Sequence, residues 1–528
     1  MTAGTTTWQR IAAVLRLEWR VQRREPLTVL YALVLGLLAA AFAAAGPVEL
    51  VRGRGSVPRD AAWSMMLASS ALTAFGQVIT TMVAATVVLR DRHDRVAELL
   101  AVTPLSRREY LTGKLLAALG VLGLVYSAIP VGLVAGAVGG GGTLSQAMTA
   151  SLPPFVMVVL PTMLAVGLLQ FGVGVLSGRL WVLVGLGLVL IWFWSGAVDV
   201  VTAGRSGLLP VLLDPFGSAP LLQATLGWSD AERVARGMPV TLGLVLSRGL
   251  WVTLGGLVAL RALLAGDELP RPRLVPDGAP QPPIGDAPPL VQPMRAMAPL
   301  PAWRAALGTA RHGAAWMLRD AGWRVLSLLG AVNVGVHAWL DGRQVSAPSA
   351  ADVTLLAYSA VTLHARLFLI LLATIYAGEL VWREREDRSA AFFDVLPVAD
   401  GALIAGRVAG VVAAQGVVVG LLAVAAAVGA GLGAGVVPDV AWLSARVVAG
   451  VLAPFVGWMI ASLAVHVLVQ QKVVAHLLCI AGWVLAVMLL GAARAEGAAV
   501  GPWMVTGVML LAATAIRVGW VRGTGRVV

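Results

Sequence analysis

The strongest constraint on the fold is a series of about twelve runs of roughly 20 mostly apolar residues, spread along the whole chain. A helix of about 20 such residues is long enough to cross the hydrocarbon core of a bilayer. Only 12% of the 528 residues are charged, and the mean hydropathy is +0.85. This is too little charge to cover the surface of a soluble protein of this size. The sequence therefore predicts an all-α polytopic membrane protein, and it argues against a soluble enzyme, a disordered chain or a nucleic-acid-binding domain.

We expect six transmembrane spans in each half of the chain. In the first half they cover residues 27–45, 65–89, 113–138, 153–176, 180–198 and 240–262, and in the second half residues 323–340, 355–378, 404–428, 447–469, 473–492 and 501–519. Residues 8–24 alternate apolar side chains with arginine at helical spacing, which predicts an amphipathic helix lying in the membrane interface. The first span resembles a signal peptide at its end, but the long charged segment before it favours an uncleaved span.

Basic residues predict how these spans are oriented. They account for a net charge of +12, and 37 of the 39 are arginine. They gather before the first span, between spans two and three, between spans eight and nine, and in the C-terminal tail, whereas the alternate loops are nearly neutral. Because cytoplasmic loops carry the excess of Lys and Arg, both termini are expected in the cytoplasm. The arginine-rich composition favours a bacterial gene and hence the bacterial plasma (inner) membrane.

A proline-rich segment divides the chain near its middle. Residues 265–302 contain eleven prolines, a composition typical of a semi-rigid linker rather than a packed core. We therefore expect a first six-span half at residues 1–264, with its N-terminal amphipathic helix, a cytoplasmic linker at 265–302, and a second six-span half at 303–528.

The two halves resemble each other most in their basic loops. At an offset of 293 residues, Arg90–Arg95 matches Arg383–Arg388 without a gap, Pro104 matches Pro397, and Gly113-Lys114 matches Gly406-Arg407. A second match, at an offset of 300, pairs Pro154-Phe155-Val156 with Pro454-Phe455-Val456 and Gln170 with Gln470. Since six spans separate equivalent points, the halves are predicted to be parallel repeats.

Each basic loop is expected to form a short amphipathic helix on the cytoplasmic face. Asp91 with Arg95, and Glu384 with Arg388, are spaced to support a helical turn, and Pro104 and Pro397 would end it. The apolar side of such a helix needs a cover. A cytosolic partner could provide it, or the helix could pack on the chain's own spans or on lipid headgroups.

These loops resemble the permeases of bacterial ABC exporters of the type 2 class, with two six-span halves in one chain. The resemblance rests on Glu98-Leu99-Leu100 through Lys114, on Gly378 through Val398, and on Leu213-Asp214-Pro215-Phe216-Gly217. It implies that the two loops couple to separate cytosolic ATP-binding subunits, present in two copies. The coupling residues implied in this way are Arg90, Asp91, Arg92, Asp94, Arg95, Glu98, Pro104, Lys114, Glu379, Arg383, Glu384, Arg385, Asp387, Pro397 and Arg407.

The sequence lacks the motifs of an enzyme. There is no G-x-x-x-x-G-K-[ST] phosphate loop, no H-E-x-x-H and no G-x-S-x-G. Cys479 is the single cysteine, and the six histidines have no metal-binding spacing. We therefore expect a transport permease that binds no cofactor or metal itself, with ATP and Mg²⁺ held by the partner subunit.

Polar side chains within the expected spans are few, and each has two interpretations. Lining of a transport pathway is one, and hydrogen bonding between helices is the other. The candidates are Gln77, Gln170, Gln415, His466 and Gln470. His364 and Arg366, in the eighth span, indicate either a polar cavity or a break in that span.

Two other functions remain compatible with the sequence. A secondary transporter of the major facilitator kind also has two parallel six-span halves and a central linker. A non-transporting membrane scaffold is the third alternative. For a transporter, the charge-poor interior favours a small or lipophilic substrate.

Overall fold

The fold was analysed in a computed structural model, which describes residues 6–44, 48–49, 56–58, 60–93, 103, 105–265, 301–386, 398, 400–469, 471–472 and 474–483. The chain divides into two compact units, Met1–Ala279 and Pro280–Val528, and each is described by itself. The boundary falls within the proline-rich segment 265–302.

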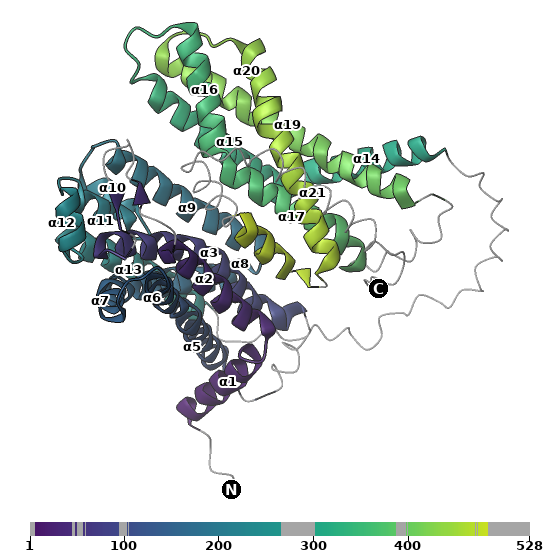
Figure 1. Ribbon diagram of the computed structural model, residues 1–528. Coiled ribbons are helices and arrows are strands. Elements are labelled where there is room, and N and C mark those ends of the chain that lie inside the picture. The colour runs from purple at the N-terminus through teal and green to yellow at the C-terminus, as the bar shows by residue number, and fades with distance from the viewer. Residues whose placement is uncertain are drawn as a thin grey trace, which may run out of the picture. The chain divides into compact units, whose positions relative to one another are not determined.

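The first unit is built almost entirely from helices (Figure 1). Strands β1 (Val48–Glu49) and β2 (Ser56–Val57) form a short antiparallel pair after the second helix. The helices are α1 (Thr7–Gln22), α2 (Pro26–Ala44), α3 (Ala62–His93), α5 (Arg107–Tyr126), α6 (Ala128–Gly139), α7 (Leu144–Pro154), the π-helix η1 (Phe155–Val159), α8 (Leu160–Ser177), α9 (Leu180–Thr202), α10 (Leu208–Leu213), α11 (Ser218–Thr225), α12 (Asp230–Ala235) and α13 (Leu242–Leu264).

The second unit repeats the order of the first elements. An amphipathic helix again precedes the first apolar helix. The helices are α14 (Ala302–Arg319), α15 (Ala321–Gly342), α16 (Ala350–His364), α17 (Arg366–Glu386), α19 (Asp400–Ala434), α20 (Val440–Val447), the π-helix η2 (Val448–Leu452) and α21 (Ala453–Leu468), followed by a short apolar helix at Val474–Trp483.

Nine helical stretches of the described residues are long and apolar enough to cross a membrane, and a bent pair of helices provides a tenth. Six of them lie in the first unit, one for each span expected there. This arrangement is that of a polytopic α-helical membrane protein. The spans expected at 473–492 and 501–519 lie partly or wholly outside the described residues, so the total of twelve remains a prediction.

Several spans begin earlier than their apolar runs suggest, because polar residues cap them. Ser106 accepts a hydrogen bond from the amide of Glu109, and the Glu109 carboxylate accepts one from the amide of Ser106. This capping box starts α5 at Arg107, so that Lys114 lies two turns inside the helix rather than near its first residue. Thr143 caps α7 in a similar way and lengthens the fourth span.

Glycines allow the first and third spans of each unit to pack closely. A Cβ atom on Gly132 of α6 would collide with the carbonyl oxygen of Gly36 in α2 and lie 2.8 Å from Cβ of Ala39. In the second unit, Gly429 of α19 faces the carbonyl oxygen of Gly335 in α15 in the same manner. Small residues four positions apart are a common means of bringing membrane helices into contact, since lipid provides no hydrophobic force between them.

A π-helical turn interrupts the fourth span of both units at matching positions. η1 and η2 begin at Phe155 and Val448, which are 448 − 155 = 293 residues apart. Each is followed by a proline at the second position of the next helix, Pro161 in α8 and Pro454 in α21. The offset of 300 that pairs Pro154 with Pro454 is therefore wrong for this region. Gln470 lies outside the described residues, so its pairing with Gln170 remains a prediction.

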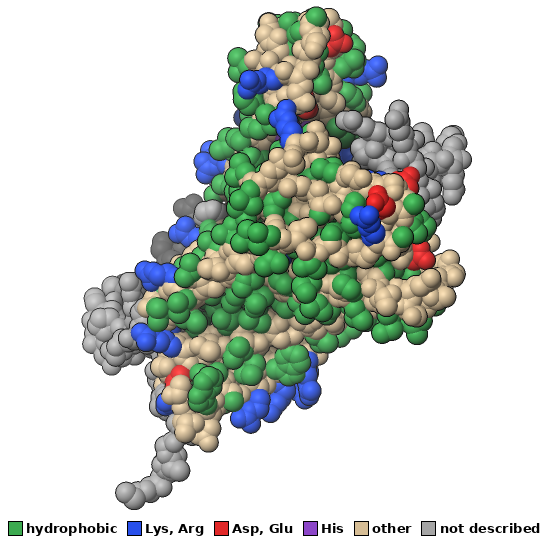
Figure 2. All heavy atoms as spheres, turned by 90° about the vertical axis from the view of Figure 1, so that its left-hand side faces the viewer, with side chains coloured by type: hydrophobic (Ala, Val, Ile, Leu, Met, Phe, Trp, Pro, Cys, Tyr) green, Lys and Arg blue, Asp and Glu red, His purple; other side chains and the backbone are tan. Residues whose placement is uncertain are grey.

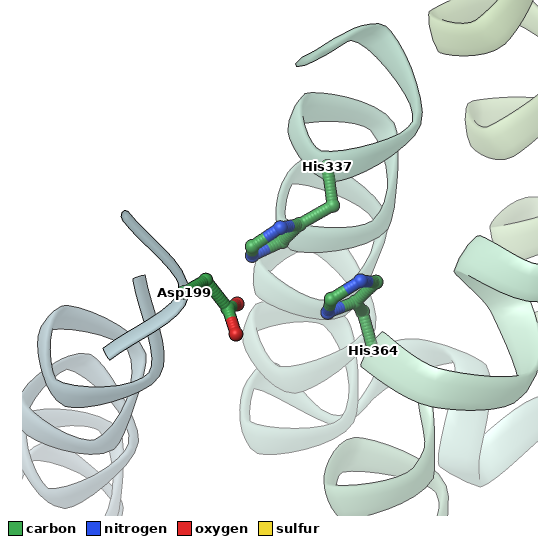
Figure 3. Close-up of side chains that lie close together, drawn as sticks. All are labelled: Asp199, His337 and His364. Carbon is green, nitrogen blue, oxygen red and sulfur yellow. The ribbon is translucent and has the colours of Figure 1, made fainter. Parts of the chain in front are cut away.

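A break interrupts the eighth span at the position that His364 and Arg366 marked in the sequence. α16 and α17 meet at an angle of 48°, with Ala365 between them. The side-chain amide of Asn333 in α15 donates a hydrogen bond to the carbonyl oxygen of His364 at 3.0 Å. This oxygen lies at the end of α16, where backbone carbonyls lack partners within the helix. The rings of His337 and His364 stack at 3.8 Å beside this bond (Figure 3).

The surface also has the character of a membrane protein. Hydrophobic side chains are widespread on the face shown in Figure 2, and charged side chains are few. Exposed large side chains include Leu37, Val131 and Leu257, each at least 60% exposed. Such a surface would be an aggregation hazard in water but suits contact with lipid.

The close packing at Gly132 generates a stability prediction. Gly132→Ala should lower the free energy of unfolding by about 1–3 kcal/mol, because the added methyl group forces α2 and α6 apart. The matched change Gly249→Ala in α13 adds a methyl group where no atom lies within 4 Å, and should leave stability unchanged or raise it by up to about 1 kcal/mol through helix propensity. Denaturant titration of both variants in mild detergent measures the difference. Equal stability of the two would contradict this packing.

Candidate functional site

The candidate site is the pair of helix ends that flank the basic loop of each unit. In the first unit, α3 ends just before this loop and α5 starts just after it. Arg90 near the end of α3 donates its Nη2 to both carboxylate oxygens of Glu18 in α1, at 2.9 and 3.0 Å. The Glu18 side chain is only 5% exposed. The amphipathic helix α1 is thus tied to the helix that leads into the loop.

The first two turns of α5 are also joined to neighbouring helices by polar contacts. Lys114 is 2% exposed, and its Nζ donates to the carbonyl oxygen of Val87 in α3 at 2.6 Å. Arg10 of α1 pairs with Glu109 at 2.9 Å, and Arg107 donates to the carbonyl oxygen of Ala262 in α13 at 3.1 Å. Both ends of the loop are therefore fixed to the same group of helices.

The glycine that follows the first loop is the contact point between α1 and α5. A Cβ atom on Gly113 would lie 2.7 Å from Cβ of Val14 and 3.0 Å from the carbonyl oxygen of Ile11. No residue larger than glycine fits at this crossing. We call the Glu18–Arg90 ion pair and the Gly113 crossing the α1 clamp.

The second unit holds its loop with the same elements. The guanidinium of Arg383, near the end of α17, lies 4.1 Å from the ring centroid of Trp316 in α14. A Cβ atom on Gly406 of α19 would collide with the carbonyl oxygen of Ala306 and lie 2.8 Å from Cβ of Thr309, both in α14. We call the Arg383–Trp316 contact and the Gly406 crossing the α14 clamp. Both clamps use arginines and glycines that the sequence places 293 residues apart.

Further contacts support the α14 clamp. Asp320 directly follows α14. The hydroxyl of Tyr376 in α17 donates a hydrogen bond to its carboxylate at 2.6 Å. Glu379, expected to be a coupling residue, pairs with Lys472 at 2.8 Å. Arg407 lies in α19 next to the Gly406 crossing.

The remaining predicted coupling residues are not described at the level of their side chains. The backbone of Asp91, Arg92, Glu384 and Arg385 is helical, as the last turn of α3 or α17. The other positions lie outside the described residues: Asp94, Arg95, Glu98, Pro104, Asp387 and Pro397. Their role in coupling, and the short helix expected in each loop, therefore remain predictions.

The polar residues within the spans are buried inside their own units. The side-chain amides of Gln77 in α3 and Gln170 in α8 both donate to the hydroxyl of Thr81 at 3.2 Å. His466 accepts a hydrogen bond from the indole of Trp382 at 3.2 Å, and Gln415 is 2% exposed. Gln470 lies outside the described residues. The bonds of Gln170 and His466 join two helices, whereas that of Gln77 lies within α3. Whether any of these residues lines a transport pathway remains a prediction.

Sequence reasoning missed a buried polar cluster in the first unit. Arg248 of α13 is 6% exposed, and its Nη1 donates to Thr162 of α8 at 2.6 Å and to the carbonyl oxygen of Pro215 at 2.8 Å. Its Nη2 donates to the carbonyl oxygen of Asp214 at 2.7 Å. An arginine inside an expected span was the signal that could have revealed this cluster.

Asp214 organises the turn that Arg248 holds. Its carboxylate accepts hydrogen bonds from the amides of Phe216, Gly217 and Ala219 at 2.6–3.0 Å, and Gly217 takes a positive φ of 91° that favours glycine. Burial raises the pKa of the Asp214 carboxyl, while Arg248 and the amide donors oppose that shift. The turn between α10 and α11 is thereby anchored to α8 and α13.

Comparison with protein families gives one match to this part of the chain. Residues 18–168 match the family described as "Fluoroquinolones export permease protein Rv2686c-like". The matched range runs from α1 into α8, and it contains the α1 clamp and the first basic loop. No curated protein matches the chain. The similarity covers less than a third of the chain and lies wholly within the first unit.

The α1 clamp can be tested by a double-mutant cycle. Arg90→Gln should destabilise the protein by about 3 kcal/mol, because it leaves the buried Glu18 charge without its partner. Glu18→Gln with Arg90→Gln should cost less than the sum of the single changes, by at least about 1 kcal/mol. Denaturant titration in detergent measures each variant, with Arg205→Gln on an exposed segment as the control. Strict additivity would show that the two side chains do not interact.

The buried arginine generates a local prediction. Arg248→Gln should leave the carbonyl oxygens of Asp214 and Pro215 without their donor, at a cost of about 3–5 kcal/mol. Amide hydrogen exchange should then accelerate in residues 208–225 by at least about ten-fold, with a much smaller change in α2. Arg261→Gln, near the end of the same helix, is the control. Unchanged exchange in residues 208–225 would rule out this anchoring role.

Proposed function

We propose that the chain is the membrane-spanning permease of an ATP-driven exporter of the ABC type 2 class, with two parallel six-span halves fused in one polypeptide. In this proposal both termini and both basic loops lie in the cytoplasm of a bacterial cell. The chain binds no nucleotide itself. ATP and Mg²⁺ are bound by two copies of a separate cytosolic subunit that docks on the loops.

One observation carries the proposal: the two basic loops are flanked by the same mechanical arrangement. Arg90 and Arg383, at equivalent positions, each contact the amphipathic helix of their own unit. Gly113 and Gly406, after the loops, each provide the crossing point for that helix. A loop held at both ends can transmit a displacement, because packed helices move as rigid bodies. The match of residues 18–168 to an export permease family supports the same function.

The proposed mechanism follows from these contacts. Nucleotide binding draws the two ATP-binding subunits together and displaces the basic loops. In the first unit the loop ends are joined to α1, α3, α5 and α13 by Arg90, Lys114 and Arg107, so a displacement of the loop moves these helices together. The spans then switch the transport pathway between its two open states. The bound partner has to favour one of the two states, since coupling requires differential affinity.

The substrate is proposed to be a small lipophilic compound. The matched family is described by fluoroquinolone export, which makes these planar aromatic drugs the first compounds to test. The outward direction of transport is proposed from the same family description.

Reversal of the loop charges tests the proposal. The four changes Arg92→Glu, Arg95→Glu, Arg385→Glu and Arg388→Glu should abolish docking of the ATP-binding subunit, because they place acidic groups where basic ones are expected to meet the partner. An affinity-tagged chain is purified from its native membranes, and ATP hydrolysis is measured in the eluate. The wild-type eluate should hydrolyse ATP, and the variant eluate should lose at least about 90% of that activity.

The control carries Arg205→Glu and Arg236→Glu, two exposed positions far from the loops in sequence. It should retain full ATP hydrolysis. Drug efflux that continues after ATP depletion and stops when the proton gradient is dissipated would instead support a secondary transporter. A wild-type eluate without ATP hydrolysis, or a loop variant with full activity, would contradict the proposal.

A further inference from the structure

The amphipathic helix α1 carries a second candidate face, which points away from Glu18 and borders α5 beyond the Gly113 crossing. Arg16, Arg20 and Arg23 are exposed and follow one another at spacings of four and three residues, which places them on one side of the helix. Figure 2 shows basic side chains at the lower end of the first unit, where Figure 1 places α1, next to hydrophobic surface.

These three arginines border a groove of about 490 Å³ between α1 and α5. Trp19 and Gly120 form its floor, and a Cβ atom on Gly120 would lie 3.1 Å from the Trp19 ring. Leu15 and Leu116 form its apolar walls. The groove thus combines a cationic rim with an aromatic and aliphatic interior.

Two acidic residues that contact or belong to α1 are paired with other arginines. Glu18 pairs with Arg90, and Glu109 pairs with Arg10. Arg16 donates its Nε to the carbonyl oxygen of Ala12. Within the described part of the chain, Arg16, Arg20 and Arg23 have no carboxylate partner. Three positive charges at one groove would therefore attract an anion from outside the chain.

The apolar interior of the groove continues along the membrane-spanning part of α5 and α6. Leu116, Leu124, Val131 and Val138 are 43%, 51%, 68% and 42% exposed, and they lie on one side of the run from Arg107 to Gly139. We call this exposed apolar strip the track. It begins at Leu116, beside the arginines, and follows α5 and α6, a stretch long and apolar enough to cross a bilayer, along which lipid acyl chains would extend.

We propose that this groove binds one anionic phospholipid from the leaflet that α1 contacts. The arginines bind the phosphate, Trp19 contacts the glycerol region, and an acyl chain lies along the track from Leu116 to Val138. Basic pockets beside membrane helices at the headgroup level are suited to anionic lipids, with a favourable contribution from each arginine. A free anion would gain nothing from the apolar track.

The second unit lacks the equivalent groove lining. At the offset of 295 that relates the α1 and α14 crossings, Trp19 corresponds to Ala314, and Arg20 and Arg23 correspond to Ala315 and Leu318. Moreover, α14 lies closer to α19, because Gly410 faces the backbone of Ala310 with a would-be Cβ contact of 2.7 Å. The lipid site is therefore a property of the first unit, and α14 provides a control surface in the same molecule.

Native mass spectrometry of the delipidated full chain in detergent tests the proposal. Titration with dioleoyl phosphatidylglycerol should give one adduct at least about ten-fold tighter than dioleoyl phosphatidylcholine. The variant Arg16→Gln/Arg20→Gln/Arg23→Gln should lose that preference. The variant with lysine at the same three positions should retain it, which separates loss of charge from loss of folding.

The control variant Arg304→Gln/Arg311→Gln/Arg319→Gln removes three arginines from α14 and should bind phosphatidylglycerol as the wild type does. Dihexanoyl phosphatidylglycerol, which shares the headgroup but has short chains, should bind at least about ten-fold more weakly than the dioleoyl form. Equal binding of the two chain lengths, displacement of the lipid by millimolar inorganic phosphate, or an unchanged preference in the glutamine variant would overturn the proposal. None of these readouts depends on ATP hydrolysis, so they are independent of the proposed transport function.

Discussion

The whole structure depends on the absence of hydrogen-bonding partners and of a hydrophobic driving force within a bilayer. Helices there must satisfy their own backbones and associate through close contact. The glycines at Gly132 and Gly429 provide that contact between the first and third spans of the two units. The same constraint explains why polar side chains meet inside each unit. Gln77 and Gln170 share Thr81, and Arg248 binds the carbonyl oxygens of a turn, because an unpaired polar group would be costly in this environment.

Sequence reasoning predicted the class of fold and the six spans of the first unit, because a length of about 20 apolar residues is a strong signal. It also identified Gly113 and Gly406 as equivalent positions, but it did not reveal what these glycines do. Their role as crossing points depends on where α1 and α14 turn back on the spans, and no local pattern encodes that contact. The third span was expected to start at residue 113, next to Lys114, because the apolar run starts there and the capping box of Ser106 and Glu109 lies in the charged segment before it. The position of Arg248 within an expected span was a signal of a buried polar cluster, but two of its partners are backbone carbonyl oxygens, which a sequence does not identify.

The two units attach their amphipathic helix to the helix before the basic loop through different contacts. In the first unit, an ion pair between Glu18 and Arg90 holds the amphipathic helix. In the second unit, the equivalent arginine, Arg383, lies over the ring of Trp316. The ion pair is directional and costly to break when buried, whereas a cation–π contact tolerates sliding of the guanidinium over the ring. The two contacts thus differ in directionality, although they lie at equivalent positions before the two basic loops.

The position of α1 links the loop to the lipid. One face of this single helix holds the end of α3 through Glu18, and the other presents three arginines beside the lipid-facing side of α5. Any force on one face is transmitted to the other, since a helix of 16 residues is stiff over its length. An anionic headgroup bound to the arginines would resist displacement of α1 and hence of the loop. Lipid charge would then act on the same element as the ATP-binding partner, from the opposite side. In the second unit, where alanine replaces Trp19 and the helix lies tight against α19, the loop would be insensitive to lipid and set by protein contacts alone.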